Sequence, residues 1–227
     1  MQKIETKTVI SRTHAGPAGN TKGPVQIKAV LFDFDGTLTA PGALDFPAIK
    51  NALGCPLEIP VLEFIQSMVT PHTRRAAMER LVAFEIEAAQ RSIPNHGAVE
   101  TVAWIKQRPL ACGIITRNSR ASVLCALEKF DPLGPGDFDL LVTREDPPAP
   151  KPSAEGVLWA ARQLNARPRE IMMVGDYLFD CQAGRAAGAT TVLLDPDNDP
   201  RLRAAQCDYR IGRLMEIKTL IVSSQLP

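Results

Sequence analysis

The stretch of sequence that decides the fold reads Lys28-Ala-Val-Leu-Phe-Asp33-Phe-Asp35-Gly-Thr37. It is a short continuous apolar run that ends in acidic residues and glycine, which is typical of a strand buried on both faces of a parallel sheet. Successive side chains of a strand alternate between its two faces, so Asp33 and Asp35 point to one side while Phe34 points away. We therefore expect two carboxylates to share one small space at the end of this strand.

Similar apolar runs recur along the chain, at residues 111–116, 170–175 and 190–195, with a weaker one at 138–142. Helical patterns lie between and before them, at residues 99–107, 120–130, 154–164 and 179–187. Strands that alternate with helices predict an α/β fold, a doubly wound parallel sheet with helices on both faces. Ligands of such sheets bind beyond the carboxyl ends of the strands.

One connection is too long for a simple crossover. About 75 residues separate Asp33 from Ala111, where a crossover needs a dozen or more. Apolar residues recur at three- and four-residue steps within 71–91, and shorter helical stretches occupy 47–53 and 60–68. We predict a small inserted α-helical cap domain at residues 41–92, a core domain at 27–40 and 93–227, and a flexible N-terminal extension at 1–26.

Composition excludes several classes of protein. The chain has 227 residues, of which 45% are hydrophobic and 22% are charged, which is average for a globular domain and excludes disordered and fibrous proteins. Its 26 basic and 25 acidic residues give a net charge of +1 with no basic block, so we expect no nucleic-acid partner. The sequence contains neither an apolar run of membrane-spanning length nor a signal peptide, which predicts no membrane partner and a cytoplasmic location. The oligomeric state stays open.

The cysteines predict no metal site and no disulfide framework. There are five of them, an odd number, widely spaced and without a CxxC pair. We expect reduced and mostly buried thiols.

Acidic residues follow two of the predicted strands. If the strands at 28–33 and 170–175 are neighbours, Asp176 and Asp180 reach the same edge as Asp33 and Asp35. Two unit charges 4 Å apart repel by about 4 kcal/mol at an effective dielectric constant of 20, so this cluster needs a cation. All candidate ligands are oxygen atoms, which favours Mg²⁺ over zinc or copper.

Phosphate-binding groups follow the other strands. Thr116 offers a hydroxyl group, and the adjacent Arg117 and Asn118 begin a helix whose free amides favour phosphate. Lys151 lies in Pro147-Pro-Ala-Pro-Lys-Pro152, where the prolines restrict the backbone around it. A lysine held in one position suits an anionic ligand.

These motifs, in this order, resemble those of the haloacid dehalogenase superfamily. The resemblance rests on Asp33-Phe-Asp-Gly-Thr37, the strand that ends in Thr116, Lys151-Pro152, and Gly175-Asp176 with Asp180. The flanking Pro94, Gly97, Glu100 and Trp104-Ile-Lys106, and Ala183-Gly-Arg-Ala-Ala-Gly188, are similar to the phosphoglycolate-phosphatase-like branch. The resemblance covers about residues 28–195 and is weak over the inserted helices.

The resemblance implies a role for each matched residue. Asp33 would be the nucleophile that forms an aspartyl-phosphate, and Asp35 would be the general acid and then the base. Asp33, the backbone carbonyl of Asp35 and Asp176 would hold Mg²⁺, with Asp180 binding through water or positioning Lys151. Thr116 and Lys151 would hold the phosphoryl oxygens. The inserted helices would close over the site as a cap.

The chain departs from that branch after the second-strand threonine. Arg117-Asn118 stands where the branch commonly reads Asn-Lys, so their expected substrate contacts are the least certain part of the pattern. Asp35, which the dehalogenases lack, favours phosphate chemistry over carbon–halogen hydrolysis. In the insertion, Arg74 and Arg75 either form a solvated helix face or bind a second anionic group of the substrate.

The sequence thus predicts a Mg²⁺-dependent phosphatase that hydrolyses a small phosphorylated metabolite, phosphoglycolate-like or a sugar phosphate. Two alternatives stay open. A phosphomutase would share the core but return the phosphoryl group to its substrate. A noncatalytic protein that binds a phosphate ligand is disfavoured because Asp33, Asp35, Lys151 and Asp176 are all intact.

Overall fold

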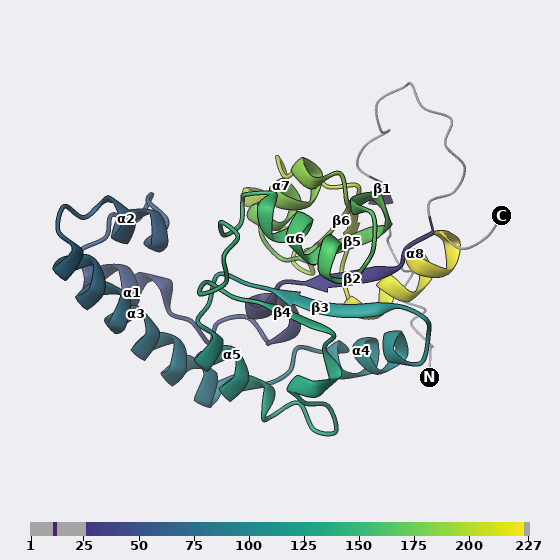
Figure 1. The fold of residues 1–227 in the computed structure, drawn as a ribbon, viewed down its shortest axis with the longest axis horizontal. Helices are drawn as coiled ribbons and strands as arrows, with labels where there is room; N and C mark the ends of the chain where they lie inside the picture. Colours follow the sequence, from purple (N-terminus) through teal and green to yellow (C-terminus); the bar gives the residue numbers. More distant parts are fainter. Residues whose placement is uncertain (1–10, 13–25, 225–227) are drawn as a thin grey trace, which may run out of the picture.

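The computed structural model describes residues 11–12 and 26–224, which build a seven-stranded sheet in the order β1-β7-β6-β5-β2-β3-β4 (Figure 1). The strands are β1 (Ser11–Arg12), β2 (Ala29–Phe32), β3 (Ala111–Ile115), β4 (Leu140–Val142), β5 (Ile171–Gly175), β6 (Thr190–Leu194) and β7 (Tyr209–Ile211). Strands β2 to β7 pair with one another in parallel, and the edge strand β1 pairs antiparallel with β7. The predicted doubly wound parallel sheet is confirmed, and β2 and β5 are neighbours as the site prediction requires.

Helices cover both faces of the sheet (Figure 1). One face packs against α4 (Ala98–Lys106), α5 (Arg120–Leu127) and α8 (Ile217–Ser224), and the other against α6 (Glu155–Gln163) and α7 (Leu178–Ala187). The alternation of β2 explains this arrangement, because Val30 and Phe32 belong to the first apolar cluster and Leu31 belongs to the second. All four residues of β2 are buried, as the apolar run predicts.

Some elements carry no clear sequence signal. Strand β7 has three residues and α8 lies near the end of the described chain, and neither was predicted. A strand this short forms because β6 offers it a partner rather than because of its own periodicity. The prediction of a flexible extension at residues 1–26 falls mostly outside the described residues, but Ser11 and Arg12 do form a strand, with Ser11 opposite Arg210 and Arg12 opposite Tyr209.

The insertion contains three helices that extend away from one end of the core (Figure 1). They are α1 (Phe46–Leu53), α2 (Val61–Ser67) and α3 (Pro71–Arg91). They pack on one another through a separate apolar cluster that includes Ile49, Ile65 and Leu81. The chain leaves and re-enters the core side by side, since the Ala40 amide donates to the Ile93 carbonyl at 2.9 Å. None of the helices within the described ranges is both long enough and apolar enough to cross a bilayer.

The expectation of five reduced thiols is wrong for one pair. Cys181 in α7 and Cys207, just before β7, form a disulfide with their Cα atoms 5.3 Å apart. The other three, Cys55, Cys112 and Cys125, are free thiols. Cysteines 26 positions apart come together because α7 and the chain entering β7 both lie against β6, a contact that sequence spacing does not reveal.

The separate apolar cluster of the insertion generates a stability prediction. Ile65 is 1% exposed, so Ile65→Ala should destabilise the three inserted helices by about 2–4 kcal/mol through the cavity it leaves. Hydrogen exchange should accelerate in α1, α2 and α3 while the amides of β2 and β5 keep their protection. Equal acceleration in both parts would show that the insertion has no core of its own.

Candidate active site

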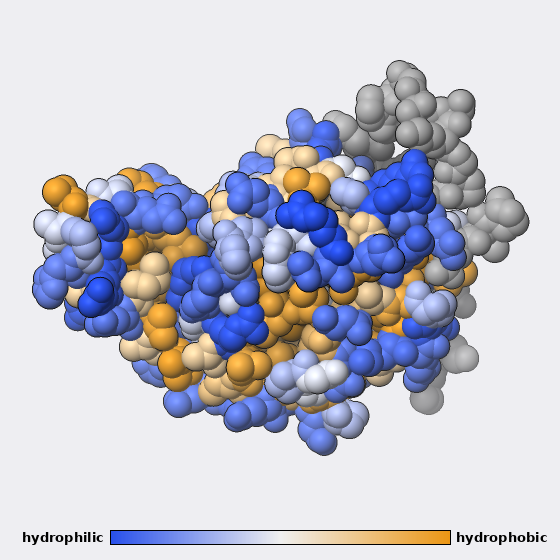
Figure 2. All heavy atoms as spheres, in the orientation of Figure 1, coloured by the Kyte–Doolittle hydropathy of each residue, from blue (hydrophilic) through white to orange (hydrophobic). Residues whose placement is uncertain are grey.

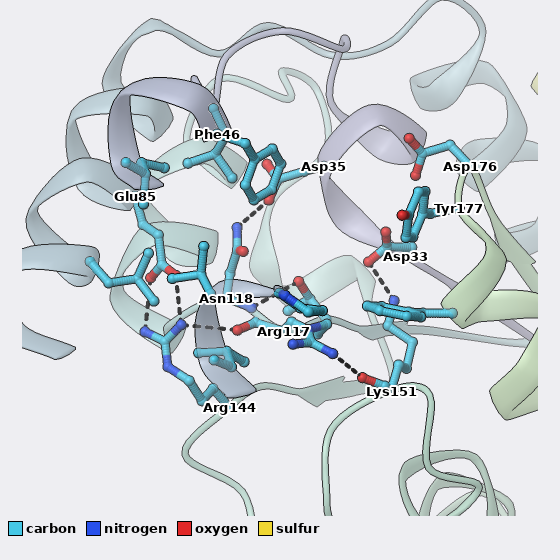
Figure 3. A pocket seen from close by; sticks show the side chains of 18 of the residues that line it. Asp33, Asp35, Phe46, Glu85, Arg117, Asn118, Arg144, Lys151, Asp176 and Tyr177 are labelled. Atoms are coloured by element: carbon cyan, nitrogen blue, oxygen red, sulfur yellow. Dashed lines mark hydrogen bonds and ion pairs between the residues drawn. The ribbon is translucent and has the colours of Figure 1, made fainter. Parts of the chain in front are cut away.

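The carboxyl ends of β2, β3 and β5 bring the predicted site residues together. Phe32 lies opposite Ile114 on one side and Val174 on the other, so Asp33, Thr116 and Asp176 leave neighbouring strands at almost the same level. These residues line a cleft of about 500 Å³ between the core and the inserted helices (Figures 2 and 3). Every predicted catalytic, metal and substrate residue lines this cleft.

A buried lysine organises the acidic residues. Lys151 is 3% exposed, and its Nζ donates to Asp33 Oδ1 at 2.6 Å (Figure 3) and to Asp180 Oδ1, also at 2.6 Å. The second oxygen of Asp180 accepts the Tyr177 amide at 3.1 Å at the start of α7. Asp180 therefore binds the lysine and also caps the start of α7.

Glycine allows Asp176 to approach the turn after β2. Gly36 has φ +76°, a left-handed conformation, and a Cβ atom built there would lie 2.2 Å from Asp176 Oδ2. The Thr37 hydroxyl donates to Asp176 Oδ1 at 3.3 Å. Carboxylate oxygens of Asp33, Asp176 and Asp180 lie within 4.8 Å of one another, and this all-oxygen set fits a hard divalent cation.

Burial and mutual repulsion raise the pKa values of these acids. Burial, with repulsion from Asp33 and Asp180, raises the pKa of Asp176 to about 8. Burial also raises the pKa of Asp180 to about 6, although Lys151 favours its ionised form. The pKa of Lys151 is raised: burial disfavours its charged form, but Asp180 and Asp33 outweigh that effect. The cluster thus carries more negative charge than one lysine compensates.

Asp35 occupies a separate position in the cleft. Burial, followed by repulsion from Asp33, raises its pKa to about 7. The Asn118 side-chain amide donates to Asp35 Oδ2, and the Thr39 hydroxyl lies 3.5 Å from Asp35 Oδ1 (Figure 3). A carboxyl group with a pKa near neutrality can donate and accept a proton at physiological pH.

Thr116 and Arg117 follow strand β3, and Arg117 connects that strand to the loop that carries Lys151, here called the lysine loop. The buried Thr116 hydroxyl accepts the Asn118 amide at 3.2 Å. The Arg117 guanidinium donates to the Lys151 carbonyl, packs over the Phe179 ring at 4.9 Å, and forms an ion pair with Glu63 of α2 at 2.6 Å. Arg117 thus contacts the lysine loop and the inserted helices at the same time.

A buried ion pair that sequence reasoning missed supports this turn. Arg144 donates to both carboxylate oxygens of Glu85 in α3, at 2.6 and 2.9 Å, and to the Arg117 carbonyl at 3.0 Å. Glu85 Oε2 also accepts the Ser119 amide at 3.1 Å. The signal was present, because Glu85 is an acidic residue four positions after Leu81 on the buried stripe of α3.

The amides that begin α5 differ from the sequence-based expectation. The Ser119 amide donates to Glu85 and the Arg120 amide to Glu145 Oε2 at 2.9 Å, so carboxylates already bind these two donors. The prediction that they are free for phosphate is wrong. Arg74 donates to the Met68 carbonyl at 2.6 Å, and neither it nor Arg75 lines the cleft, which favours the solvated-face alternative.

Comparison with known proteins places this geometry in a family. Residues 27–188 match the family model of haloacid dehalogenase-like hydrolases. The chain belongs to this family. The family match spans the strands and loops that carry Asp33, Thr116, Lys151 and Asp176, and the resemblance expected from the sequence is confirmed.

Relatives of this haloacid dehalogenase-like hydrolase include a phosphatase and hydrolases without a named substrate. It is 38% identical to an uncharacterized hydrolase of Saccharomyces cerevisiae, over 76% of this chain and 79% of that protein. It is 29% identical to an N-acetylmuramic acid 6-phosphate phosphatase of Pseudomonas aeruginosa, over 78% and 87%. A solved hydrolase from Pseudomonas syringae shares the fold with a TM-score of 0.71 at 23% identity, over 85% and 97%.

The Glu85–Arg144 pair generates a prediction about the hydrolase fold. Glu85→Gln keeps the shape of the side chain but leaves the Arg144 charge buried without a counter-charge, which should cost about 3–5 kcal/mol in the free energy of unfolding. Glu87→Gln on the same helix is the matched control, because its pair with Arg91 is more than half exposed and worth about 0.5 kcal/mol or less. Denaturant unfolding measures both variants. Similar small losses in the free energy of unfolding for both variants would show that the buried pair stabilises the fold no more than the exposed pair does.

Proposed function

We propose that this hydrolase is a Mg²⁺-dependent phosphatase that acts on a small phosphorylated metabolite. The observation that carries the proposal is the position of Asp33, whose carboxylate is bound by the buried Lys151 and lies in the same cleft as Asp35. The phosphatase named among the relatives supports this reaction class. Removal of a phosphoryl group requires a nucleophile, a proton donor and positive charge, and this cleft offers candidates for all three.

In the first step, an Asp33 carboxylate oxygen attacks the phosphorus atom of the substrate. A phosphorus–oxygen bond forms to Asp33 while the bond to the leaving oxygen breaks. Asp35, protonated below its pKa of about 7, gives its proton to that leaving oxygen. The products of this step are an aspartyl-phosphate on Asp33, an alcohol and an ionised Asp35.

In the second step, the ionised Asp35 accepts a proton from water as the water oxygen attacks phosphorus. The bond between Asp33 and phosphorus breaks, inorganic phosphate leaves, and both carboxyl groups return to their starting states. Asn118 holds Asp35 Oδ2 in place through both steps. We assign Asn118 and Arg117 mainly to positioning Asp35 and the Lys151 loop, rather than to the substrate contacts that the motif implies.

Lys151 and Thr116 hold the transferring phosphoryl oxygens. We propose that Asp33, the Asp35 backbone carbonyl and Asp176 hold Mg²⁺, with Asp180 bound through water. When bound, Mg²⁺ supplies the positive charge that the acidic cluster lacks and draws the phosphoryl oxygens toward it. We further propose that residues 41–92 act as the cap of a core formed by 27–40 and 93–227, and exclude water when they close over the cleft.

Replacing the proposed nucleophile tests the mechanism. Asp33→Asn should abolish multiple-turnover phosphate release, because an amide cannot attack phosphorus, and Asp35→Asn should slow release by about 10²–10⁴-fold. Asp197→Asn, at an exposed position, is the control and should keep full activity. The measurement is inorganic phosphate in stoichiometric excess over enzyme, which also distinguishes a phosphatase from a phosphomutase. Near-normal release by Asp33→Asn would disprove covalent catalysis.

The raised pKa values of Asp176 and Asp180 predict how Mg²⁺ affects stability. A carboxylate whose folded-state pKa lies above its unfolded value of about 3.9 costs stability as it ionises. The metal-free protein should therefore lose stability as pH rises from about 4 to about 8. Because Mg²⁺ binds the ionised forms, the Tm increase it causes should be larger at pH 8 than at pH 5.5.

Chelation and readdition of Mg²⁺ in thermal unfolding experiments measure this effect. Asp176→Asn should remove most of the Mg²⁺-induced Tm increase, whereas the control Asp197→Asn should keep it. Chelation should also remove phosphatase activity, and Ca²⁺ should restore it poorly because of its longer bonds and higher coordination number. A Tm increase independent of pH would be inconsistent with metal binding at these carboxylates.

A further inference from the structure

The side of the cleft formed by the insertion is lined mostly by apolar residues, with Lys50, Glu58 and Glu85 as its charged members. Six of the residues that line it are Leu44, Phe46, Leu57, Pro60, Val61 and Leu62. Phe46 is 52% exposed and Leu57 is 70% exposed, although large apolar side chains are usually buried. Figure 2 shows apolar side chains gathered in the hollow between the insertion and the core. This surface faces the carboxylates across the same cleft, and Figure 3 shows Phe46 in the cleft with Asp35 and Tyr177.

The cationic side chains that line the cleft already have partners. Lys50 donates to the Leu57 carbonyl, Arg117 pairs with Glu63, and Arg144 pairs with Glu85. The other two are Lys151, which pairs with Asp33 and Asp180, and Arg201, which pairs with Asp199. In the proposed mechanism Lys151 binds the transferring phosphoryl group. Among the described lining residues, the insertion therefore presents a mostly apolar surface to the rest of the substrate, and Lys50, bound to a backbone carbonyl, is the only cation that it contributes.

We infer that the group released from phosphate is uncharged and largely apolar, such as an alkyl or aryl alcohol. This inference rests on the proposed phosphatase function and narrows its substrate class. Against a mostly apolar wall, a second anionic group, such as a carboxylate or another phosphate, would lose its hydration and gain at most the Lys50 ammonium, while Glu58 on the same side would repel it, which is unfavourable. An apolar group would instead gain from burial. A cleft of about 500 Å³ is large enough for an organic group of ordinary ligand size.

A series of n-alkyl phosphates tests the inference on the full-length protein with Mg²⁺. Ethyl, butyl and hexyl phosphate release alcohols of nearly equal acidity, so differences in kcat/KM report binding of the chain rather than intrinsic reactivity. We expect kcat/KM to rise about two- to fourfold per added methylene group. A carboxylate at the end of the butyl chain should lower kcat/KM at least tenfold, and pyrophosphate should be a poor substrate. A flat series, or a preference for the carboxylate or pyrophosphate, would overturn the inference.

Variants show whether the apolar wall is responsible. Phe46→Ala should lower kcat/KM for hexyl phosphate by about tenfold and for ethyl phosphate by less than twofold. Val69→Ala is the matched control, because Val69 is apolar, 92% exposed and in the same insertion but does not line the cleft. It should leave the whole series unchanged. If Phe46→Ala lowers kcat/KM equally for all substrates, the apolar residues help the insertion to close rather than recognise the substrate, and the inference is wrong.

Direct binding separates failure of this inference from failure of the proposed function. Ethyl-, butyl- and hexylphosphonate are not hydrolysed, and calorimetry should show a Kd that falls with chain length and rises for the Phe46→Ala variant. If no phosphate ester is hydrolysed but this trend appears, the phosphatase proposal fails and apolar recognition stands. If a small aryl phosphate is hydrolysed but the Kd of the phosphonates does not depend on chain length, the phosphatase proposal stands and the inference fails.

Discussion

One buried ammonium group has to compensate an acidic edge of the sheet. Lys151 contacts Asp33 and Asp180 at 2.6 Å, while burial and repulsion from Asp33 and Asp180 raise the pKa of Asp176 to about 8. The surrounding backbone is shaped to allow this crowding. A Cβ atom at Gly36 would lie 2.2 Å from Asp176 Oδ2, and one at Gly175 would lie 2.1 Å from Asp180 Cγ. The glycines therefore allow the acids to lie close together, and the charge of this acidic cluster is compatible with a divalent cation.

A second charged arrangement keeps the other half of the site in position. Arg144 binds the carbonyl of Arg117, and Glu85 binds the amide of Ser119. Arg117 and Ser119 are the two residues that flank Asn118. Asn118 in turn binds Asp35. The orientation of the proposed general acid thus depends on a buried ion pair to which the inserted helix α3 contributes Glu85. The insertion therefore helps to position this acid as well as lining the cleft.

The sequence predicted the parts of this structure that depend on local pattern. Apolar runs located the strands around Phe32, Ile114 and Val174, and the rule that ligands bind at strand carboxyl ends placed the acids together. It did not predict partners that meet only through the fold. Glu85 and Arg144 are 59 positions apart, and Asn118 lies 83 positions after its partner Asp35.

Among the described residues, the two ion pairs that join the insertion to the core differ in how much they resist motion. The side chains of Arg117 and Glu63 are 18% and 41% exposed, so their ion pair is partly solvated and inexpensive to break. Those of Arg144 and Glu85 are 10% and 3% exposed, and separating them would leave two buried charges unpaired. A motion that changes the width of the cleft therefore meets little resistance at α2 and strong resistance at the Glu85 level of α3. Arg117 can therefore lose its partner in α2 while Arg144 keeps the Arg117 carbonyl, and with it Asn118 beside Asp35, in position.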